Sequence, residues 1–180
     1  MDADFAQLYR EHFPFVWKSL RRLGLRESDT ADAAQEVFLV VYRKLAEFEG
    51  RSQLTTWLFG ICLRVARDRQ RLAHNRREIG ADDDLIERAA GASESASDEV
   101  ERRQAAALLE RILDGLEFDQ RTVFVLFELD GMRGDEIAEL LQIPAGTVAS
   151  RLRLAREAFQ RAVSRLQARE RFALSPGGAP

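Results

Sequence analysis

The sequence predicts an all-α protein made of two small helical domains that are joined by an acidic, flexible linker. Apolar residues recur at spacings of three and four over most of the chain, which is the period of an amphipathic helix. Residues 79–100 are small, acidic and poor in large apolar side chains, so they cannot bury much surface. Residues 122–127 have a β-type composition but lie between helical patterns, and we expect a buried helix there.

The apolar pattern of the N-terminal region is interrupted by Pro14. A proline is tolerated in the first turn of a helix but not in its interior. We therefore expect a short helix followed by a second helix that starts at Pro14 and ends at Gly24, since glycine is the usual residue after a helix C-terminus.

Two further helices are expected in the first half. Ser28-Asp29 offers a cap for a helix over about 29–46. Phe48 to Gln53 read as a loop by composition. A long helix should then run from about Leu54 to Arg77, apolar and aromatic at its start and rich in arginine at its end.

The second half shows four helical stretches, separated by glycines and by the Pro144-Ala145-Gly146 turn. They cover about 101–115, 119–130, 133–141 and 146–170. The expected division of the chain is a first domain at 1–78, the linker at 79–100, a second domain at 101–170 and a disordered tail at 171–180.

The formal net charge is only −3, but the charges are segregated. Residues 64–77 hold six arginines against one acid, and residues 151–171 hold seven arginines against two acids. Residues 79–101 hold eight acids against one base. Local patches rather than the total charge govern binding to a polyanion. Two basic helices of this kind favour nucleic acid as a partner.

Other features restrict the class of protein. The single cysteine, Cys62, allows no internal disulfide and fits a reducing compartment; we expect it in the core. No apolar run approaches the length of a membrane span, and the acidic N-terminus lacks the pattern of a signal peptide. We expect a cytoplasmic protein without membrane contact of its own. No catalytic constellation is visible, and no enzymatic activity, cofactor or metal is expected.

The strongest local signal is a helix-turn-helix pattern over 133–153. Ala138 is small where two helices would cross, and Thr147 can cap the second helix. If Val148, Leu152, Ala155 and Phe159 point inward, then Ala149, Ser150, Arg153 and Arg156 face solvent, with Arg151 near the edge. A recognition helix presents such residues to the major groove. The alternative is an ordinary helical hairpin with a solvated basic face.

Aromatic residues lie close to arginines in the first half. Phe48, Trp57 and Phe59 surround the 48–56 loop, ahead of the six arginines. A single-stranded nucleic acid is bound by stacking bases on rings and holding the backbone with cations. Because Trp57 and Ile61 share a helix face, we expect Trp57 in the core and Phe59 as the more exposed ring.

These segments, in this order, resemble sigma factors of the extracytoplasmic-function (ECF) group of the sigma-70 family. Asp32-x-x-Gln35-Glu36-x-Phe38 is similar to the family's segment that docks on the clamp helices of the polymerase β′ subunit. Phe48-x-Gly50 and Thr56-Trp57-Leu58-Phe59 fall in the pattern that recognises and melts the −10 element. The resemblance implies −10 contacts from Phe48, Gly50, Arg51, Ser52, Gln53, Trp57, Phe59, Arg64, Arg67 and Arg71, and polymerase contacts from Asp32, Gln35, Glu36 and Phe38.

The second half resembles sigma region 4. Gln120-Arg121, Glu136-Ile137-Ala138 and Ile143-Pro144-x-Gly146-Thr147-Val148-x-Ser150-Arg151-Leu152 match its pattern. The chain departs from it at Ala149 and Leu154, where basic residues are common, and Arg64 departs from the region 2 pattern. The resemblance implies −35 contacts from Thr147, Ala149, Ser150, Arg151, Arg153 and Arg156.

The resemblance also implies the partners: core RNA polymerase, through its β′ clamp helices and β flap, promoter DNA, and an anti-sigma factor. The alternative function is that of a stand-alone helix-turn-helix regulator whose first half senses a signal or dimerises.

The linker limits how far apart the two domains can lie in the free chain. A flexible linker of about 22 residues has an average end-to-end distance of only about 25 Å, whereas promoter elements two helical turns apart need roughly 70 Å. We therefore expect the free chain to bind promoter DNA poorly until polymerase separates its domains.

Overall fold

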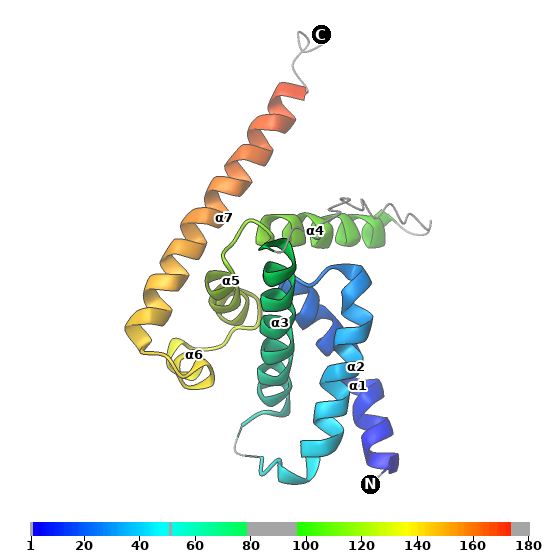
Figure 1. Cartoon of the computed structure of the whole chain (residues 1–180). Helices are drawn as coiled ribbons and strands as arrows, with labels where there is room; N and C mark the ends of the chain where they lie inside the picture. Colours follow the sequence, from blue (N-terminus) through cyan, green and yellow to red (C-terminus); the bar gives the residue numbers. More distant parts are fainter. Residues whose placement is uncertain (1, 51, 79–96, 174–180) are drawn as a thin grey trace. The chain divides into compact units, whose positions relative to one another are not determined.

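Every regular element that the structure describes is helical, which confirms the predicted fold class (Figure 1). The structure is a computed structural model and describes residues 2–50, 52–78 and 97–173. Most of the predicted linker and the last seven residues of the predicted tail lie outside these ranges. The chain forms two compact units, Met1–Ala107 and Leu108–Pro180.

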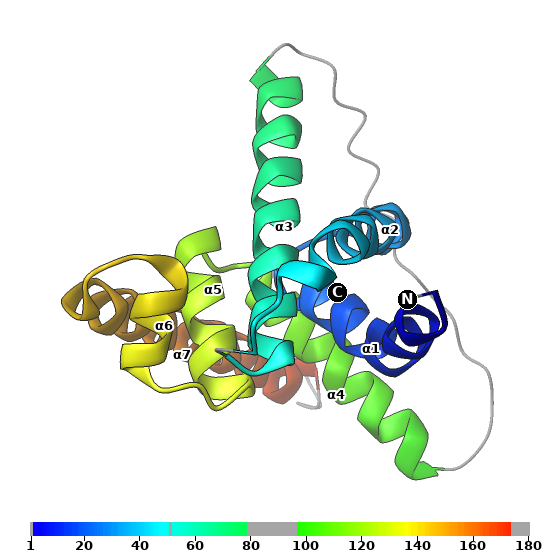
Figure 2. The ribbon, with the colours of Figure 1, turned by 90° about the horizontal axis from the view of Figure 1, so that it is seen from below.

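The first unit is built on three long helices, α1 (Asp2–Arg22), α2 (Glu27–Lys44) and α3 (Leu54–Glu78). A short 3₁₀ turn, η1 (Leu45–Glu47), follows α2. The three long helices pack against one another in both views (Figures 1 and 2). Their shared core contains fully buried side chains of Val16, Leu20, Val37, Val41, Leu58, Cys62 and Ala66.

The predicted break at Pro14 is wrong, because α1 continues through the proline. An internal proline costs about 3 kcal/mol in a helix. Tertiary packing on both sides offsets that cost. Before the proline, the Tyr9 ring lies 4.5 Å from the Phe38 ring, centroid to centroid. After it, Val16 and Leu20 are completely buried.

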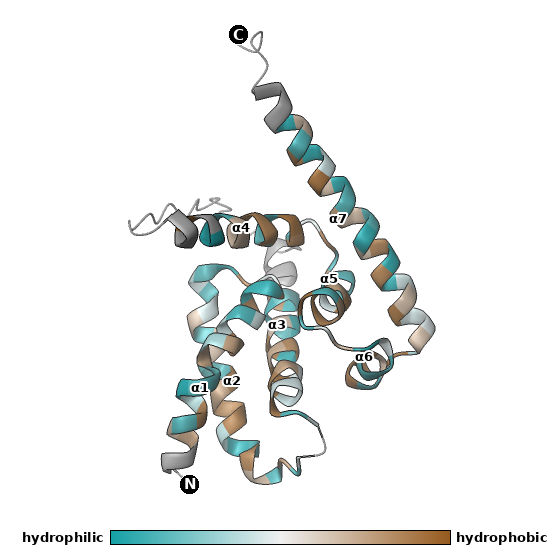
Figure 3. Ribbon diagram, turned by 180° about the vertical axis from the view of Figure 1, so that it is seen from behind, coloured by the Kyte–Doolittle hydropathy of each residue, from teal (hydrophilic) through white to brown (hydrophobic). Residues whose placement is uncertain are grey.

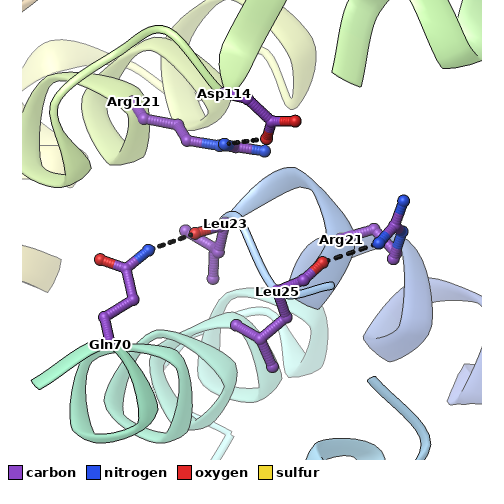
Figure 4. A network of polar contacts seen from close by, with 6 residues as sticks. All are labelled: Arg21, Leu23, Leu25, Gln70, Asp114 and Arg121. Atoms are coloured by element: carbon purple, nitrogen blue, oxygen red, sulfur yellow. Dashed lines mark hydrogen bonds and ion pairs between the residues drawn. The ribbon is translucent and has the colours of Figure 1, made fainter. Parts of the chain in front are cut away.

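The connection between α1 and α2 follows the prediction at Gly24 but not at the cap of α2. Gly24 has a φ of 99°, and its N–H donates to the Arg21 carbonyl at 3.0 Å. The expected Ser28-Asp29 cap is absent because α2 already begins at Glu27. Gln70 of α3 donates to the Leu23 carbonyl at 3.3 Å and so ties α3 to this turn (Figure 4).

The second part of the chain begins with α4 (Ser97–Leu113), four residues earlier than predicted. It continues with α5 (Phe118–Phe124), the π-helical segment η2 (Val125–Leu129), α6 (Gly134–Leu141) and α7 (Ala145–Ala173). The run of β-type composition lies in α5 and η2, where residues 121–126 are buried, so the predicted buried helix is confirmed. The α7 helix reaches three residues into the predicted tail.

A buried arginine joins α5 to the end of α4. Arg121 is only 4% exposed, and its guanidinium donates to the Asp114 carboxylate at 2.7 Å (Figure 4). The guanidinium is buried, but the Asp114 side chain is 66% exposed, so water screens the pair and its contribution to stability is modest. The pair ties α5 to the residue that follows α4.

Candidate nucleic-acid and polymerase interfaces

The turn between α6 and α7 is made by Gln142 rather than by the Pro-Ala-Gly segment that the sequence suggested. Gln142 has a φ of 54° and a ψ of 45°, in the left-handed region. The Ile143 N–H donates to the Ala138 carbonyl at 3.1 Å, which closes the end of α6. Gly146 lies inside α7. The helix-turn-helix itself is present as predicted, with a different residue producing the sharp turn.

The first turns of α7 have the predicted inner and outer faces. Val148, Leu152 and Ala155 are buried, and the Phe159 ring stacks on Phe124 at 4.9 Å between centroids. Figure 3 shows hydrophilic and hydrophobic residues alternating along this helix. The exposed residues on its outer side are Ala149, Ser150, Arg153 and Arg156, with Arg151 half-buried at the edge.

Thr147 does not cap α7, because the helix begins two residues earlier at Ala145. The Thr147 N–H donates to the Pro144 carbonyl at 2.9 Å, and the Ser150 hydroxyl donates to the Thr147 carbonyl at 3.0 Å. Thr147 is half-buried, in the first turn.

Each arginine of the proposed −35 surface contacts a carboxylate of the second unit. Arg151 pairs with Asp119 of α5 at 2.5 Å. Arg153 pairs with Glu157 one turn along α7 at 2.5 Å. Arg156 pairs with Glu128 of η2 at 2.6 Å. The sequence pattern predicted the exposure of these arginines but not their partners, because two of the three carboxylates come from other elements.

The expected exposure of the two aromatic residues on α3 is wrong. Phe59 is 1% exposed, whereas Trp57 is half-buried and lies 5.1 Å from the Phe48 ring. The helix contacts both α1 and α2, so side chains on adjacent positions enter the core. A ring as buried as Phe59 cannot stack on a base, and Phe48 and Trp57 are the aromatic pair available beside the loop.

The loop before α3 is open to solvent. Gly50 has a φ of 70°, which favours glycine, and no atom lies within 4 Å of the position that a Cβ would occupy there. Ser52 and Gln53 are exposed, and Arg51 lies outside the described residues. Farther along α3, Arg64, Arg67 and Arg71 are exposed, and Arg71 pairs with Asp68 at 3.7 Å. The three arginines are spaced by three and four residues and so lie on one exposed side of α3.

Three of the four predicted polymerase contacts lie on one exposed face of α2. Asp32, Gln35 and Glu36 are exposed. Phe38 is not available: it is 3% exposed, and its ring packs against Tyr9. The Phe38 ring is part of the hydrophobic core, where a large apolar side chain between two helices is usually found.

The same face of α2 carries two hydrophobic residues that the sequence analysis missed. Leu39 is 57% exposed and Tyr42 is 49% exposed. They follow Gln35 at intervals of four and three residues, which places them on one helical stripe. Counting three and four residues along the helix from Gln35 would have identified Leu39 and Tyr42 from the sequence alone. Glu36 at the side of this stripe pairs with Arg69 of α3 at 3.2 Å.

The described residues contain no group of histidine, cysteine and acidic side chains suited to a metal ion. Cys62 is completely buried, and burial raises the pKa of its thiol to about 12. In the part of the chain that the structure describes, no helix is both long and apolar enough to cross a membrane.

Comparison with known proteins matches two family models to the chain. The family described as Sigma-70 region 2 matches residues 8–77, and the family described as Sigma-70, region 4 matches residues 106–159. The ECF RNA polymerase sigma-E factor of Escherichia coli K12 is 36% identical over 145 residues, which cover 77% of this chain and 75% of that protein. The RNA polymerase sigma-H factor of Pseudomonas aeruginosa is 32% identical over 145 residues, with the same shares covered.

Two solved structures share the fold. CnrH, in complex with the cytosolic domain of CnrY, has a TM-score of 0.63 at 24% identity and covers 91% of this chain and 90% of its own. The sigma factor RpoE of Bartonella quintana, in complex with the anti-sigma factor NepR, has a TM-score of 0.66 at 21% identity, covering 89% and 97%. With both family regions present in this order, the chain belongs to the ECF group of the sigma-70 family of RNA polymerase sigma factors and is a transcription initiation factor that directs RNA polymerase to promoters.

Proposed function

We propose that the first unit binds core RNA polymerase and melts the −10 element, while the helix-turn-helix reads the −35 element. The observation that carries this proposal is the exposed basic face of α7, in the same chain as an aromatic pair beside an open loop. The first arrangement suits duplex DNA, and the second suits bases that have left the duplex. A reducing cytoplasmic location fits this function and remains part of the proposal.

The −35 surface comprises the outer side of α7, namely Thr147, Ala149, Ser150, Arg151, Arg153 and Arg156. Arg153 lies near its centre and is exposed. Loss of one phosphate or base contact should weaken binding by about 1–3 kcal/mol. We expect Arg153→Ala to lower promoter binding by the holoenzyme at least fivefold. Arg161→Ala, at an exposed arginine farther along α7, is the matched control and should have little effect.

The −10 surface comprises Phe48, Trp57 and the loop residues Gly50, Ser52 and Gln53, with Arg51 retained from the sequence prediction. Arg64, Arg67 and Arg71 would hold the DNA backbone. A Trp57→Ala variant should transcribe poorly from a duplex template. Activity should return on a template that is already unpaired at the −10 element, because stacking of a flipped base is then less limiting.

The polymerase-binding surface comprises Asp32, Gln35 and Glu36, to which we add Leu39 and Tyr42. An apolar centre beside polar groups is the usual composition of a protein interface. We propose the β′ clamp helices as its partner and the β flap as the partner of the second unit. Asp32→Ala should reduce capture of core polymerase, whereas Glu47→Ala, at an exposed acid of η1, should not.

An anti-sigma factor is a further proposed partner. Both solved neighbours are in complexes, one with an anti-sigma factor and one with a cytosolic domain. Purification of the tagged chain from its own cells should recover such a protein in addition to polymerase subunits. Recovery of polymerase subunits alone would remove this part of the proposal.

Transcription in vitro tests the proposed function as a whole. Core polymerase is supplied with templates whose upstream region is randomised, with and without the chain. We expect transcripts that depend on the chain and come from templates with two enriched elements. A stand-alone regulator instead predicts tight binding to duplex DNA without polymerase and no such transcripts, and that result would overturn the proposal.

A further inference from the structure

Arg156 is held differently from the other two arginines of the −35 surface. Its Nε donates to the Glu128 carboxylate at 2.6 Å. The guanidinium carbon lies 5.2 Å from the centroid of the Phe127 ring. Arg151 and Arg153 instead donate to their carboxylates through terminal nitrogens, Nη2 of Arg151 and Nη1 of Arg153.

The point of attachment decides what the guanidinium can still do. A guanidinium has one N–H at Nε and four at its two terminal nitrogens, arranged as a rigid planar fork. Within the described residues, no hydrogen bond or ion pair of Arg156 uses a terminal nitrogen. The Glu128 carboxylate at Nε and the Phe127 ring under the guanidinium therefore restrict the orientation of the fork. The two terminal nitrogens remain for a ligand.

Both restraining residues come from the π-helical segment η2. Phe127 and Glu128 are consecutive there, and the Asp130 N–H donates to the Val125 carbonyl five residues earlier. Such widened turns occur frequently at functional sites. Phe127 is half-buried, and Arg156 is on the exposed side of α7 with Ala149 and Arg153. The fork is thus positioned on the surface proposed to face the −35 element.

We propose that Glu128 is a positioning residue, with Phe127 assisting it, and that it orients Arg156 to bind a DNA phosphate through the terminal nitrogens. The proposal rests on the proposed function of α7. Its physical basis is that restricting a side chain before binding reduces the entropy lost on association. Bidentate contact with phosphate also needs a defined orientation of the fork.

Positioning by Glu128 and simple electrostatics predict opposite changes in DNA affinity when the Glu128 carboxylate is removed. Removing an acid beside DNA reduces repulsion, so charge alone predicts tighter binding for any neutral replacement of Glu128. Positioning predicts weaker binding for Glu128→Ala, which lacks an acceptor. Glu128→Gln keeps an acceptor oxygen and should restore binding. The relative DNA affinities of the wild type, Glu128→Ala and Glu128→Gln therefore distinguish positioning from simple electrostatics.

The test uses the holoenzyme, made from core polymerase and the full chain, and the duplex that the wild-type holoenzyme selects from the randomised library. Binding is measured at several salt concentrations for the wild type, Glu128→Ala, Glu128→Gln, Arg156→Ala and the double variant. We expect Glu128→Ala to bind about threefold to tenfold more weakly, with a salt slope lower by about 1, as for Arg156→Ala. Glu128→Gln should bind at least as tightly as wild type with an unchanged slope.

The double variant should bind no more weakly than Arg156→Ala, because Glu128 acts through that arginine. Phe127→Leu keeps apolar bulk but removes the ring face, and should weaken binding in the same direction by a smaller factor. Glu139→Ala, an exposed acid on α6, controls for charge removal. Circular dichroism checks that each variant retains its helix content.

Equal or tighter binding by Glu128→Ala would overturn the inference, as would Glu128→Gln binding as weakly as Glu128→Ala. Additive losses in the double variant would also overturn it. Failure of the proposed function looks different: the wild-type holoenzyme would then enrich no sequence from the library. The two failures are therefore distinguishable.

Discussion

The two long arginine-rich helices, α3 and α7, differ in how much of their circumference is buried. α3 begins with an apolar half and continues with arginines, whereas the arginines of α7 are spread along the helix from Arg151 onward. The first turns of α7 bury a narrow stripe, Val148, Leu152 and Ala155. The corresponding part of α3 buries more than half of its circumference, with Leu58, Phe59, Ile61, Cys62, Leu63, Val65 and Ala66 all inside.

This difference explains where the sequence pattern succeeded. α7 rests on α5 and α6 along one face, so helical periodicity separates its inner and outer residues. α3 contacts α1 and α2, and neighbouring positions such as 58 and 59 are both buried. Periodicity then gives the correct helix but cannot say which aromatic residue remains at the surface. The comparison can be tested by substitutions that report burial directly.

The largest effect is expected at Phe59. Phe59→Ala should lower the free energy of unfolding by about 3–5 kcal/mol, because it leaves a cavity in a closely packed core. Trp57→Ala, at the half-buried neighbour, should cost only about 1–2 kcal/mol, in line with one aromatic contact and partial burial. Urea denaturation followed by tryptophan fluorescence measures this, since both tryptophans, Trp17 and Trp57, lie in the first unit.

If Phe59→Ala and Trp57→Ala lowered the free energy of unfolding by similar amounts, both rings would be core residues. That result would contradict the assignment of Trp57 to the surface. Since Trp57→Ala keeps only the Trp17 signal, its unfolding is also followed by circular dichroism. The Phe59→Ala variant retains both tryptophans and needs no such correction.

The next largest effect is expected on α7. Leu152→Ala should cost about 2–4 kcal/mol, since Leu152 is 6% exposed. Leu154→Ala should change stability by less than about 0.5 kcal/mol, because Leu154 is 39% exposed. Circular dichroism at increasing urea follows both units, and comparison with tryptophan fluorescence, which reports only the first unit, isolates the transition of the second. Equal costs at the two leucines would mean that the narrow buried stripe is wrong.

The pH dependence of the free energy of unfolding should also report the burial of Cys62 on α3. The Cys62 thiol has a pKa near 9.0 when exposed and about 12 in the folded protein. Above pH 9 the unfolded chain therefore binds fewer protons, and stability falls as pH rises toward 12. The loss should approach about 1.4 kcal/mol per pH unit.

Cys62→Ala should remove that part of the slope, so the difference between the two proteins from pH 9 to 10.5 is the quantity to compare. Identical slopes would indicate that the thiol ionises freely in the folded state. Labelling with a thiol reagent at pH 8 provides a second measurement and should require unfolding of the first unit.

The smallest effect is expected at the turn before α7. Gln142 adopts the left-handed conformation, which costs about 1–2 kcal/mol for a residue with a Cβ. Gln142→Gly should therefore stabilise the second unit by roughly 0.5–1 kcal/mol, after the larger entropy of glycine in the unfolded chain is subtracted. The thermal unfolding midpoint of the second unit should rise. A lower midpoint would mean that the Gln142 side chain makes a stabilising contact that exceeds the backbone strain.

Local signals accounted for much of the molecule. Gly24 ended α1 as predicted, and α3 began at Leu54 as predicted. The failures came from tertiary effects on local rules. Pro14 is an interior residue of α1 because packing on both sides outweighs the missing hydrogen bond. The N-terminus of α2 lacks a side-chain cap, although a capping sequence follows it by one or two residues.

The candidate surfaces divide in the same way. Helical spacing was sufficient to place Arg153 and Arg156 outside and Leu152 inside, because one narrow contact determines both faces. It could not place Phe38 or Phe59, whose types suit either an interface or a core. Phe38 packs against Tyr9 of α1, and Phe59 is buried on a helix that contacts both α1 and α2.

The sequence by itself determined the helical class, the helix-turn-helix, the family and the charge of each segment, because these depend on residue type and local period. Only the tertiary structure decided which aromatic ring is buried and which carboxylates hold Arg151 and Arg156. Those two carboxylates belong to residues that lie 32 and 28 positions away in the sequence, and Arg69 and Glu36 are 33 apart. Such pairs form only when helices pack, and a local pattern carries no information about them.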